Sequence, residues 1–334
     1  MKLTGRSIGA MLGAALLPLV AGCERHSSAE HYYLVTTNTR LDYWQSAADG
    51  LAQAGAEYGV HADLRGPEDY DAQAEVQEFR NVVALKPDGI LVSVADEKLM
   101  RPAIDSAVAA GIPVITLDSD APHSRRLYFI GTNNTEVGRL GGQELVRRLG
   151  GKGNVVFFTM PGQPNLDERL KGYEDALSNS PGVNVAAIVD IRGQGAVAFD
   201  KTEEYLARTG KDKIDGFVCL EASAGKEVAE VFRRNNTKDR VIVAMDVDQD
   251  TLDMVKSGEI AATIAQKPFT MAYVGVKALD ELHHYPIGSP ATNYAVDPFA
   301  PVPAFVDTGV SVVDASNVDF YLRARKASRN RQGM

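Results

Sequence analysis

The sequence predicts an α/β protein of two lobes, each built on a parallel β-sheet flanked by helices. Short apolar segments alternate with segments of helical periodicity along most of the chain, a pattern typical of repeated strand–helix–strand units. Such units form parallel sheets that are covered by helices on both faces. Because the alternation runs through two successive series, we expect two lobes rather than one continuous sheet.

The first series is predicted to run from a strand at residues 32–36 to a strand at residues 112–117. Its first helix, expected at residues 43–58, has apolar residues at positions 44, 47, 48, 51, 54 and 58, which lie on one helical face. The strands are nearly all apolar, so both faces of the sheet should be buried. The remaining expected strands are residues 60–64 and 89–94, and the remaining helices are residues 72–85 and 97–110.

The second series is predicted to begin with a helix at residues 136–149 and to end with one at residues 269–284. Residues 291–303 are rich in proline and predict an irregular crossover. The arginines and lysine after residue 320 predict a frayed, solvated end, with contact to a membrane surface as the alternative. The intervening strands are expected at residues 154–159, 183–190, 216–220, 241–245 and 261–265, and the helices at residues 167–177, 198–207, 225–235 and 249–256.

The N-terminus predicts an export signal followed by a lipid attachment site. Lys2 and Arg6 precede an apolar stretch over residues 8–21, which is interrupted by glycines and a proline and therefore suits a signal better than a spanning helix. The stretch ends in Leu-Val-Ala-Gly-Cys at residues 19–23, which resembles a bacterial lipobox. This resemblance implies cleavage before Cys23 and a lipid on its sulfur; the alternative is an ordinary signal peptide that contains a cysteine.

Composition excludes several classes of function. The formal charge is −9, and losing Lys2 and Arg6 gives −9 − 2 = −11, a surface that repels nucleic acid. Cys219 would be the one remaining thiol and is expected to be buried and inert. The histidines show no ligand spacing in the sequence, so we expect no metal site. No dinucleotide or phosphate-binding motif indicates a cofactor.

Polar residues follow the predicted strands in both series. Ligands of open parallel sheets bind beyond the carboxyl ends of the strands, and there the sequence places Asp96, Asp118, Glu221, Asp246 and Gln266. Each acid alone could be an ordinary turn or helix cap. Their occurrence in both halves predicts one polar cleft between the two lobes.

Tyr43 and Trp44 are the aromatic candidates for the same cleft. They stand at the start of the helix expected at residues 43–58, with Trp44 on its apolar face and Tyr43 beside that face. Core packing is therefore the competing role for Trp44. A flat ring suits the apolar face of a sugar, whose hydroxyl hydrogens would be accepted by carboxylates and amides.

Several segments together resemble the ribose-binding group of periplasmic sugar-binding proteins, the extracytoplasmic receptors of ABC importers. The resemblance covers roughly residues 32 to 320, and the order and spacing of the segments carry it. These segments are TTNTRLDYWQSAADG at 36–50, KPDGILV at 86–92, GIPVITLD at 111–118, IGTNN at 130–134, RLKGY at 169–173 and GEIAATIAQ at 258–266.

This resemblance implies a set of ligand contacts. The binding aspartate of the first lobe falls on Asp118 and that of the second lobe on Asp246. The glutamine beside the hinge falls on Gln266, and the aromatic pair on Tyr43 and Trp44.

Other family contacts differ in this chain. Ser119 replaces the arginine that follows the first aspartate in ribose binders. Family asparagines are replaced at Leu41, Ser93 and Leu220, and Glu221 is the polar group nearest to Leu220. Asn165 and Arg169 occupy the region of a second-lobe binding loop. The scaffold is expected to be retained with an altered specificity, so ribose itself is not implied.

The resemblance also implies a domain plan with three crossovers, near Asn133, near Gln266 and within residues 297–306. We expect a signal peptide at residues 1–22, a tether at 23–31 and a basic tail at 321–334. The first lobe is expected to comprise residues 32–133 and 267–298, and the second lobe residues 134–266 and 299–320. The part after the signal has 334 − 22 = 312 residues, which suits two lobes.

The implied function is that of a monomeric, lipid-anchored receptor outside the cytoplasmic membrane, which delivers a small neutral sugar or polyol to an ABC permease. A sensory receptor that signals to a membrane partner without transport is the alternative. An enzyme is not expected, because the segment around Ser223 lacks the first glycine of the GxSxG motif and no histidine follows a strand end. Paired acids for glycoside cleavage remain a weaker alternative.

Overall fold

The computed structural model describes residues 26–288 and 297–332. The predicted signal peptide and Cys23 therefore lie outside the described residues. Within the described ranges, no helix combines the length and the apolarity that crossing a bilayer requires.

The first lobe contains a six-stranded sheet in the order β11-β5-β4-β3-β1-β2, in which all neighbouring strands are parallel. Successive residues of β1 point to opposite faces: Tyr32 and Leu34 pack under α1 and α9, whereas Tyr33 and Val35 pack under α2 and α3. The strands are β1 (His31–Val35), β2 (His61–Arg65), β3 (Gly89–Val92), β4 (Val114–Leu117), β5 (Phe129–Gly131) and β11 (Phe305–Asp307), and the helices are α1 (Asp42–Tyr58), α2 (Ala72–Ala84), α3 (Glu97–Ala109) and α9 (Pro268–His284).

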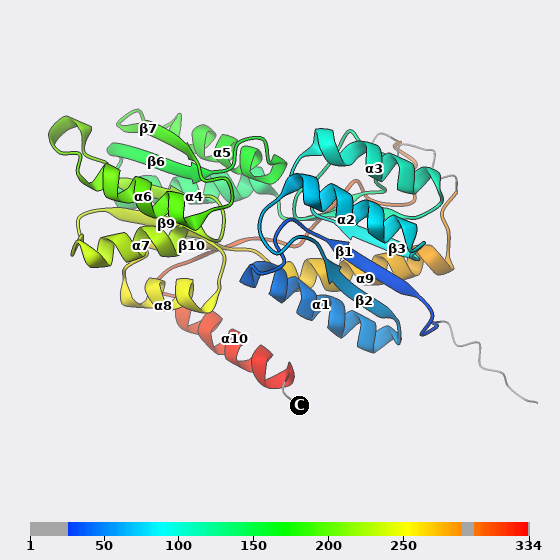
Figure 1. The fold of residues 1–334 in the computed structure, drawn as a ribbon. Coiled ribbons are helices and arrows are strands. Elements are labelled where there is room, and N and C mark those ends of the chain that lie inside the picture. Colours follow the sequence, from blue (N-terminus) through cyan, green and yellow to red (C-terminus); the bar gives the residue numbers. More distant parts are fainter. Residues whose placement is uncertain (1–25, 289–296, 333–334) are drawn as a thin grey trace, which may run out of the picture.

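The second lobe repeats this plan in the order β12-β10-β9-β8-β6-β7, with only the edge strand β12 antiparallel to its neighbour. The helices α4 and α5 pack together on one face, and α6 and α7 pack together on the other (Figure 1). Its elements are α4 (Asn134–Leu149), β6 (Gly153–Thr159), α5 (Pro164–Leu177), β7 (Val183–Asp190), α6 (Gly195–Leu206), the 3-10 turn η1 (Gly210–Asp212), β8 (Gly216–Cys219), α7 (Ala224–Arg234), β9 (Val241–Met245), α8 (Gln249–Ser257), β10 (Ala262–Ala265), β12 (Ser311–Val313) and α10 (Val318–Gln332).

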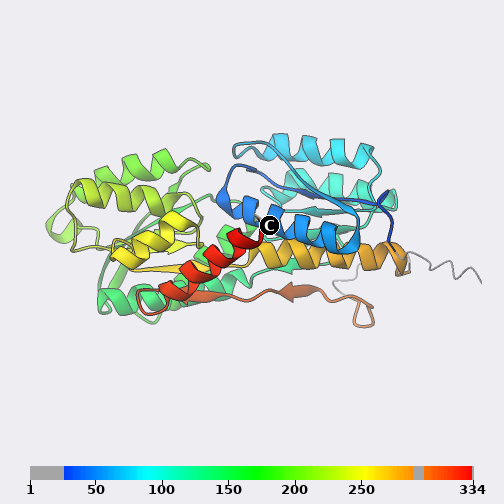
Figure 2. The ribbon, with the colours of Figure 1, turned by 90° about the horizontal axis from the view of Figure 1, so that it is seen from below.

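The chain passes between the lobes three times, between β5 and α4, between β10 and α9, and between β11 and β12 (Figure 2). The third crossing comes after Asp307, later than the range 297–306 expected from the sequence, and the assignment of residues 299–307 to the second lobe is wrong. β11 extends the first sheet beside β5, where Phe305 stacks on Phe129 with 5.1 Å between ring centroids. This edge strand has only three residues and is largely exposed, so the sequence contains no apolar alternation that would predict it.

The expected frayed tail at residues 321–334 is also wrong, because helix α10 occupies residues Val318–Gln332 and lies against α8. Tyr321 and Leu322 pack on the core of the second lobe, and this tertiary contact supports a helix whose many charges do not predict it. The guanidinium of Arg325 donates to the Val247 carbonyl at 3.3 Å and lies 3.8 Å from the Asp42 carboxylate on the first lobe. The helix therefore reaches from one lobe to the other (Figure 2).

The packing of α4 on α5 depends on two glycines at the point of closest approach. A Cβ on Gly138 would lie 2.0 Å from the carbonyl oxygen of Arg169 and 2.8 Å from the Cα of Gly172. A Cβ on Gly172 would lie 2.2 Å from the carbonyl oxygen of Thr135. These obstacles are backbone atoms, so a side chain at either position forces the helices apart.

We predict that Gly138→Ala lowers the free energy of unfolding by about 1–3 kcal/mol, as over-packing does in a close-packed core. The sign is diagnostic because helix propensity alone would favour alanine by up to about 1 kcal/mol. Urea unfolding of the variant and of Gly288→Ala, an exposed position with open space around it, provides the comparison. A variant as stable as the parent would show that the two helices do not need this contact.

Candidate ligand-binding site

The carboxyl ends of the central strands of both sheets face one cleft between the lobes. Residues of the first lobe at this cleft follow β1, β2 and β4 or begin α1, and residues of the second lobe follow β6, β7, β8, β9 and β10 or begin α5. The cleft is lined by Thr37, Asn38, Leu41, Tyr43, Trp44, Tyr70, Asp118, Met160, Gln163, Asn165, Leu166, Arg169, Gly193, Glu221, Ala222, Ser223, Asp246 and Gln266.

Asp118 and Asp246 occupy corresponding positions at the ends of β4 and β9. Both have left-handed backbone conformations, with φ of 64° and 69°. Each still donates its backbone N–H to the neighbouring strand, Asp118 to Ile130 at 3.0 Å and Asp246 to Ile264 at 2.8 Å. Aspartate tolerates this conformation better than most residues, and such strain is typical of functional sites.

Asp118 is the acceptor at the centre of the contacts between the lobes. Its Oδ1 accepts the hydroxyl of Tyr43 at 2.7 Å, and its Oδ2 accepts the Nδ2 amide of Asn165, from the second lobe, at 3.1 Å. Tyr43 in turn meets Trp44 edge-to-face at 4.9 Å. The first turn of α1 therefore supplies both the predicted aromatic pair and a donor that orients the aspartate.

Arg169 is the buried cation of the site, with 2% of its surface exposed. Its Nε donates to Asn134, one terminal nitrogen to the Leu220 carbonyl and the other to Gln266, at 2.8–2.9 Å. The Nε2 of Gln266 donates to Asp246 at 3.0 Å, and the guanidinium lies 3.8 Å from Asp118. Arg169 is thus linked to Asp246 through the neutral side chain of Gln266, and to Asp118 by a longer ionic contact.

Burial controls the ionisation of these carboxyl groups. Desolvation raises the pKa of Asp246 to about 7, although the charge of Arg169 and the amide of Gln266 act in the opposite direction. Desolvation also raises the pKa of Asp118, against the lowering effects of Arg169, Tyr43 and a hydrogen bond from Ser93. Burial therefore favours the protonated form of both acids, and the shared cation Arg169 opposes it.

Three amide oxygens of the cleft are buried without a hydrogen-bond partner. They belong to Asn38, Gln163 and Asn165, which all line the cleft. An unpaired buried acceptor costs about 1–3 kcal/mol. The arrangement therefore suits a bound molecule that carries several hydrogen-bond donors.

The predicted residues Ser93 and Ser119 do not line the cleft. The Ser119 hydroxyl donates to the Val94 carbonyl at 2.6 Å, so it fastens the turn after β4 instead of facing the cleft. Ser93 is buried behind Asp118, to which it donates.

Glu221 lines the cleft, but its carboxylate is occupied. It accepts the N–H groups of Ser223 and Ala224 and the Ser223 hydroxyl, at 2.7–2.8 Å, at the start of α7. Asn165 and Arg169 reach the cleft from the first half of α5. Asn38 and Gln163 were not predicted from the sequence, although Asn38 closely follows β1 and its position after a strand end could have indicated it.

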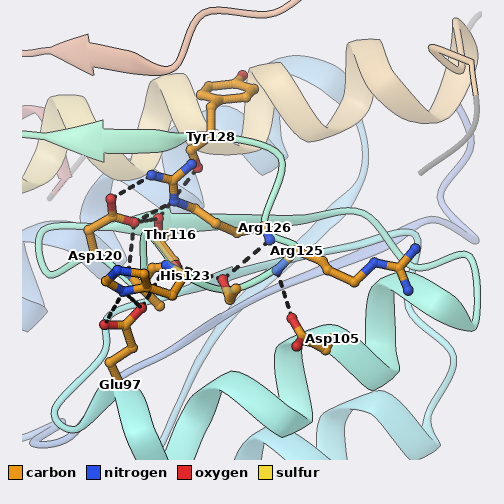
Figure 3. Close-up of polar contacts among 10 residues, drawn as sticks. Glu97, Asp105, Thr116, Asp120, His123, Arg125, Arg126 and Tyr128 are labelled. Carbon is orange, nitrogen blue, oxygen red and sulfur yellow. Dashed lines mark hydrogen bonds and ion pairs between the residues drawn. The ribbon is translucent and has the colours of Figure 1, made fainter. Parts of the chain in front are cut away.

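The loop that carries Asp118 is fastened by a bidentate ion pair. The guanidinium of Arg126 donates to both oxygens of Asp120 at 2.5 and 2.6 Å, and the Thr116 hydroxyl donates to the same carboxylate at 2.5 Å (Figure 3). Side-chain exposures of 6% for Arg126 and 17% for Asp120 mean that water competes little for this pair. The ion pair therefore fixes the turn two residues beyond Asp118.

A family model described as a periplasmic binding protein domain matches residues 32–283. The chain therefore belongs to the periplasmic binding proteins, the family that its two lobes and interlobe cleft define. This confirms the family and the two-lobed α/β fold expected from the sequence segments.

Among curated proteins, the chain is similar to the ribose import binding protein of Bacillus subtilis, with 22% identity over 64% of this chain and 69% of that protein. It is also similar to the xylitol-binding protein of Mycolicibacterium smegmatis, with 24% identity over 72% of this chain and 68% of that protein.

Among solved structures, it is similar to an arabinose binding protein of Geobacillus stearothermophilus, with 33% identity, a TM-score of 0.72 and coverage of 87% of this chain and 99% of the other. A carbohydrate transporter solute binding protein of Agrobacterium radiobacter, solved with D-arabinose, has 26% identity and a TM-score of 0.80 over 89% of this chain and 99% of its own.

We predict that Asp246→Asn removes a pH dependence of stability. The folded protein keeps a proton on Asp246 up to about pH 7, whereas an unfolded carboxyl group releases it near pH 3.9. The stability of the wild type relative to the variant is therefore greatest below about pH 4. It should fall as pH rises towards 7, by at most about 1.4 kcal/mol per pH unit.

Urea midpoints of the ligand-free proteins between pH 4 and 8 measure this difference. Asparagine keeps the shape of aspartate and also tolerates a left-handed backbone, so the change is mainly one of charge. Asp63→Asn, at an exposed position of β2, is the matched control. Parallel curves for the wild type and Asp246→Asn would contradict the raised pKa.

Proposed function

We propose that this periplasmic binding protein is the solute receptor of an ABC importer and captures a small neutral sugar or polyol in the interlobe cleft. The observation that carries the proposal is the excess of acceptors at the cleft: two aspartates and the unpaired oxygens of Asn38, Gln163 and Asn165. A polyhydroxylated molecule supplies a matching set of donors.

Charge argues against an anionic solute. All three kinds of donor nitrogen on Arg169 are used by protein acceptors, so the buried cation has little left to offer a phosphate or carboxylate. In the adjoining part of the cleft, Lys226 lies 3.7 Å from Asp248, and Arg325 lies 3.8 Å from Asp42. Lys267 also lines this adjoining part, so the argument concerns the deeper part of the cleft, where Arg169 is the cation and a desolvated anion would face Asp118, Glu221 and Asp246.

The aromatic and apolar side chains suit the carbon skeleton of the same molecule. Tyr43 and Trp44 of the first lobe and Met160 and Leu166 of the second lobe all line the cleft. Rings of this kind stack on the C–H face of a sugar while the acceptors bind its rim. Contacts from both lobes would then favour closure, since closure is driven by interactions that the open state lacks.

The importer assignment rests on the family and on the printed names of relatives such as the ribose import binding protein. The competing assignment is a sensory receptor that signals to a membrane partner. Neighbouring genes for a permease and an ATPase, or instead for a histidine kinase, separate the two. For either role we propose solute binding without catalysis.

We predict that Asp118→Ala and Asp246→Ala each weaken binding of the solute by at least roughly tenfold. Above about pH 7, where Asp246 is ionised, a hydrogen bond to such a charged group contributes about 1.5–3 kcal/mol, and each factor of ten in affinity corresponds to 1.4 kcal/mol. A thermal-shift screen with neutral pentoses, hexoses and polyols, alongside sugar phosphates, first identifies the solute, because a ligand of the native state raises the Tm. Calorimetry then measures the variants.

Asp63→Ala serves as the control, since this exposed aspartate lies on β2 away from the cleft residues. Tight binding of a sugar phosphate with no response to neutral sugars would overturn the proposed solute class. If both folded variants keep the affinity of the wild type, the binding site is elsewhere.

We further propose that Cys23 carries a lipid that holds the mature protein at the outer side of the cytoplasmic membrane or at the cell surface, as the lipobox-like residues 19–23 indicate. Cys23→Ser is expected to move the protein from the membrane fraction to the soluble fraction and to abolish incorporation of labelled palmitate. The thiol of Cys219 is buried, so Cys219→Ser is the matched control and should still be labelled. Labelling of Cys23→Ser at the parental level would contradict the assignment.

A further inference from the structure

Four metal-ligand side chains meet at the end of the first lobe that is remote from the cleft. His26 and Glu30 precede β1, whereas Asp280 and His284 lie one turn apart at the end of α9. The cleft lies beyond the carboxyl ends of the strands, and this cluster lies at the amino end of β1. We propose that these four residues form a binding site for a divalent transition-metal ion, with Zn²⁺ as its preferred occupant.

The distances in this cluster suit a tetrahedral ion. The Nδ1 of His26 lies 3.1 Å from the Oδ1 of Asp280, and the Nε2 of His284 lies 3.3 Å from the Oε2 of Glu30 and 3.7 Å from the same Asp280 oxygen. One ligand atom from each residue lies within 4.8 Å of all the others. Bonds of about 2.0–2.1 Å place the corners of a tetrahedron about 3.3–3.4 Å apart, so only small movements are needed.

The local charge calls for a cation at this position. Glu30 and Asp280 are 7% and 4% exposed. Among the described residues, their ion-pair partners are the two histidines, and no lysine or arginine pairs with them. A divalent ion would neutralise both carboxylates while the imidazoles stay neutral, which is the form that binds metals. The rival arrangement has the histidines protonated and no ion bound.

The surroundings orient the ligand atoms. The Tyr32 hydroxyl donates to the Oε2 of Glu30 at 3.3 Å, and the Ser27 N–H donates to its Oε1 at 2.9 Å. The ring of His26 packs against the rings of Tyr58, at 5.1 Å, and His284, at 5.4 Å. Such outer contacts limit the rotamers of a ligand set before the metal arrives.

The donor set selects the class of ion. Two imidazole nitrogens with two carboxylate oxygens suit Zn²⁺ and similar borderline ions, whereas Ca²⁺ and Mg²⁺ prefer oxygen ligands alone. Ligand spacing along the sequence does not reveal such a cluster, since His26 and Asp280 are 254 residues apart in the chain. A bound ion would fasten the segment before β1 to the end of α9. His26 lies only three residues after Cys23, so the ion would also fasten the chain next to the proposed lipid. This last point rests on the proposed function, whereas the metal site itself does not.

Zn²⁺ titration of the untagged protein after chelator treatment tests the proposal. We expect one Zn²⁺ per chain by calorimetry, a rise in Tm that a chelator reverses, and a visible absorption spectrum of tetrahedral Co²⁺ on substitution. His26→Ala and His284→Ala should each weaken Zn²⁺ binding at least roughly tenfold. Asp280→Asn, which preserves side-chain size, provides a milder variant if either alanine variant fails to fold.

His123→Ala is the matched control, because this exposed histidine also lies 3.1 Å from a carboxylate, that of Glu97, but belongs to no such cluster. Its Zn²⁺ affinity should equal that of the wild type, and affinity for the sugar or polyol should be unchanged in all variants. Absence of saturable Zn²⁺ binding by the wild type overturns the site in favour of the protonated-histidine arrangement. Equal affinity in the wild type and in Asp280→Asn or the alanine variants overturns it as well. Failure of the sugar screen leaves these readouts unaffected.

Discussion

The sharing of one buried guanidinium between two buried aspartates determines how the cleft is built. Arg169 lies 3.8 Å from Asp118 and reaches Asp246 through Gln266, so each lobe contributes an acid to the same cation. Removing one partner from such a buried group typically costs about 3–5 kcal/mol, because the remaining charges lose their compensation. The close contact of α4 and α5 at Gly138 and Gly172 places Arg169 at this point, which links helix packing in the second lobe to the charge balance of the site.

The two lobes use the same local device to present their acids. In each lobe the aspartate directly follows a parallel strand, and its backbone N–H still donates a hydrogen bond to the neighbouring strand. The aspartate itself has a left-handed backbone conformation. The chain holds the resulting strain with contacts elsewhere, such as the Arg126–Asp120 ion pair behind Asp118. A rigid turn on each lobe leaves the relative position of the lobes as the variable that a solute can change.

The proposed solute site and the proposed metal site lie at opposite ends of the strands of the first lobe and would act on different parts of the molecule. The first joins the two lobes through a neutral molecule, whereas the second would join two distant segments of one lobe through an ion. In both places, buried acids lack a full complement of fixed cations. The difference is that imidazoles surround Glu30 and Asp280, while amides and aromatic rings surround Asp118 and Asp246.

The sequence by itself determined most helices, the central strands and the acids at the strand ends, because apolar periodicity and strand-end position are local properties of the chain. The short strands β5, β11 and β12 and the charged helix α10 were not predicted. Asp118, Asp246 and Gln266 could be predicted in this way, and the family resemblance supported them. Only the tertiary structure decided that Ser119 turns inward and that β11 joins the first sheet. It also decided that His26 and Glu30 meet Asp280 and His284. These features depend on which distant segments become neighbours in the folded chain. A three-residue exposed strand and ligands 254 residues apart produce no local sequence pattern from which they could be predicted.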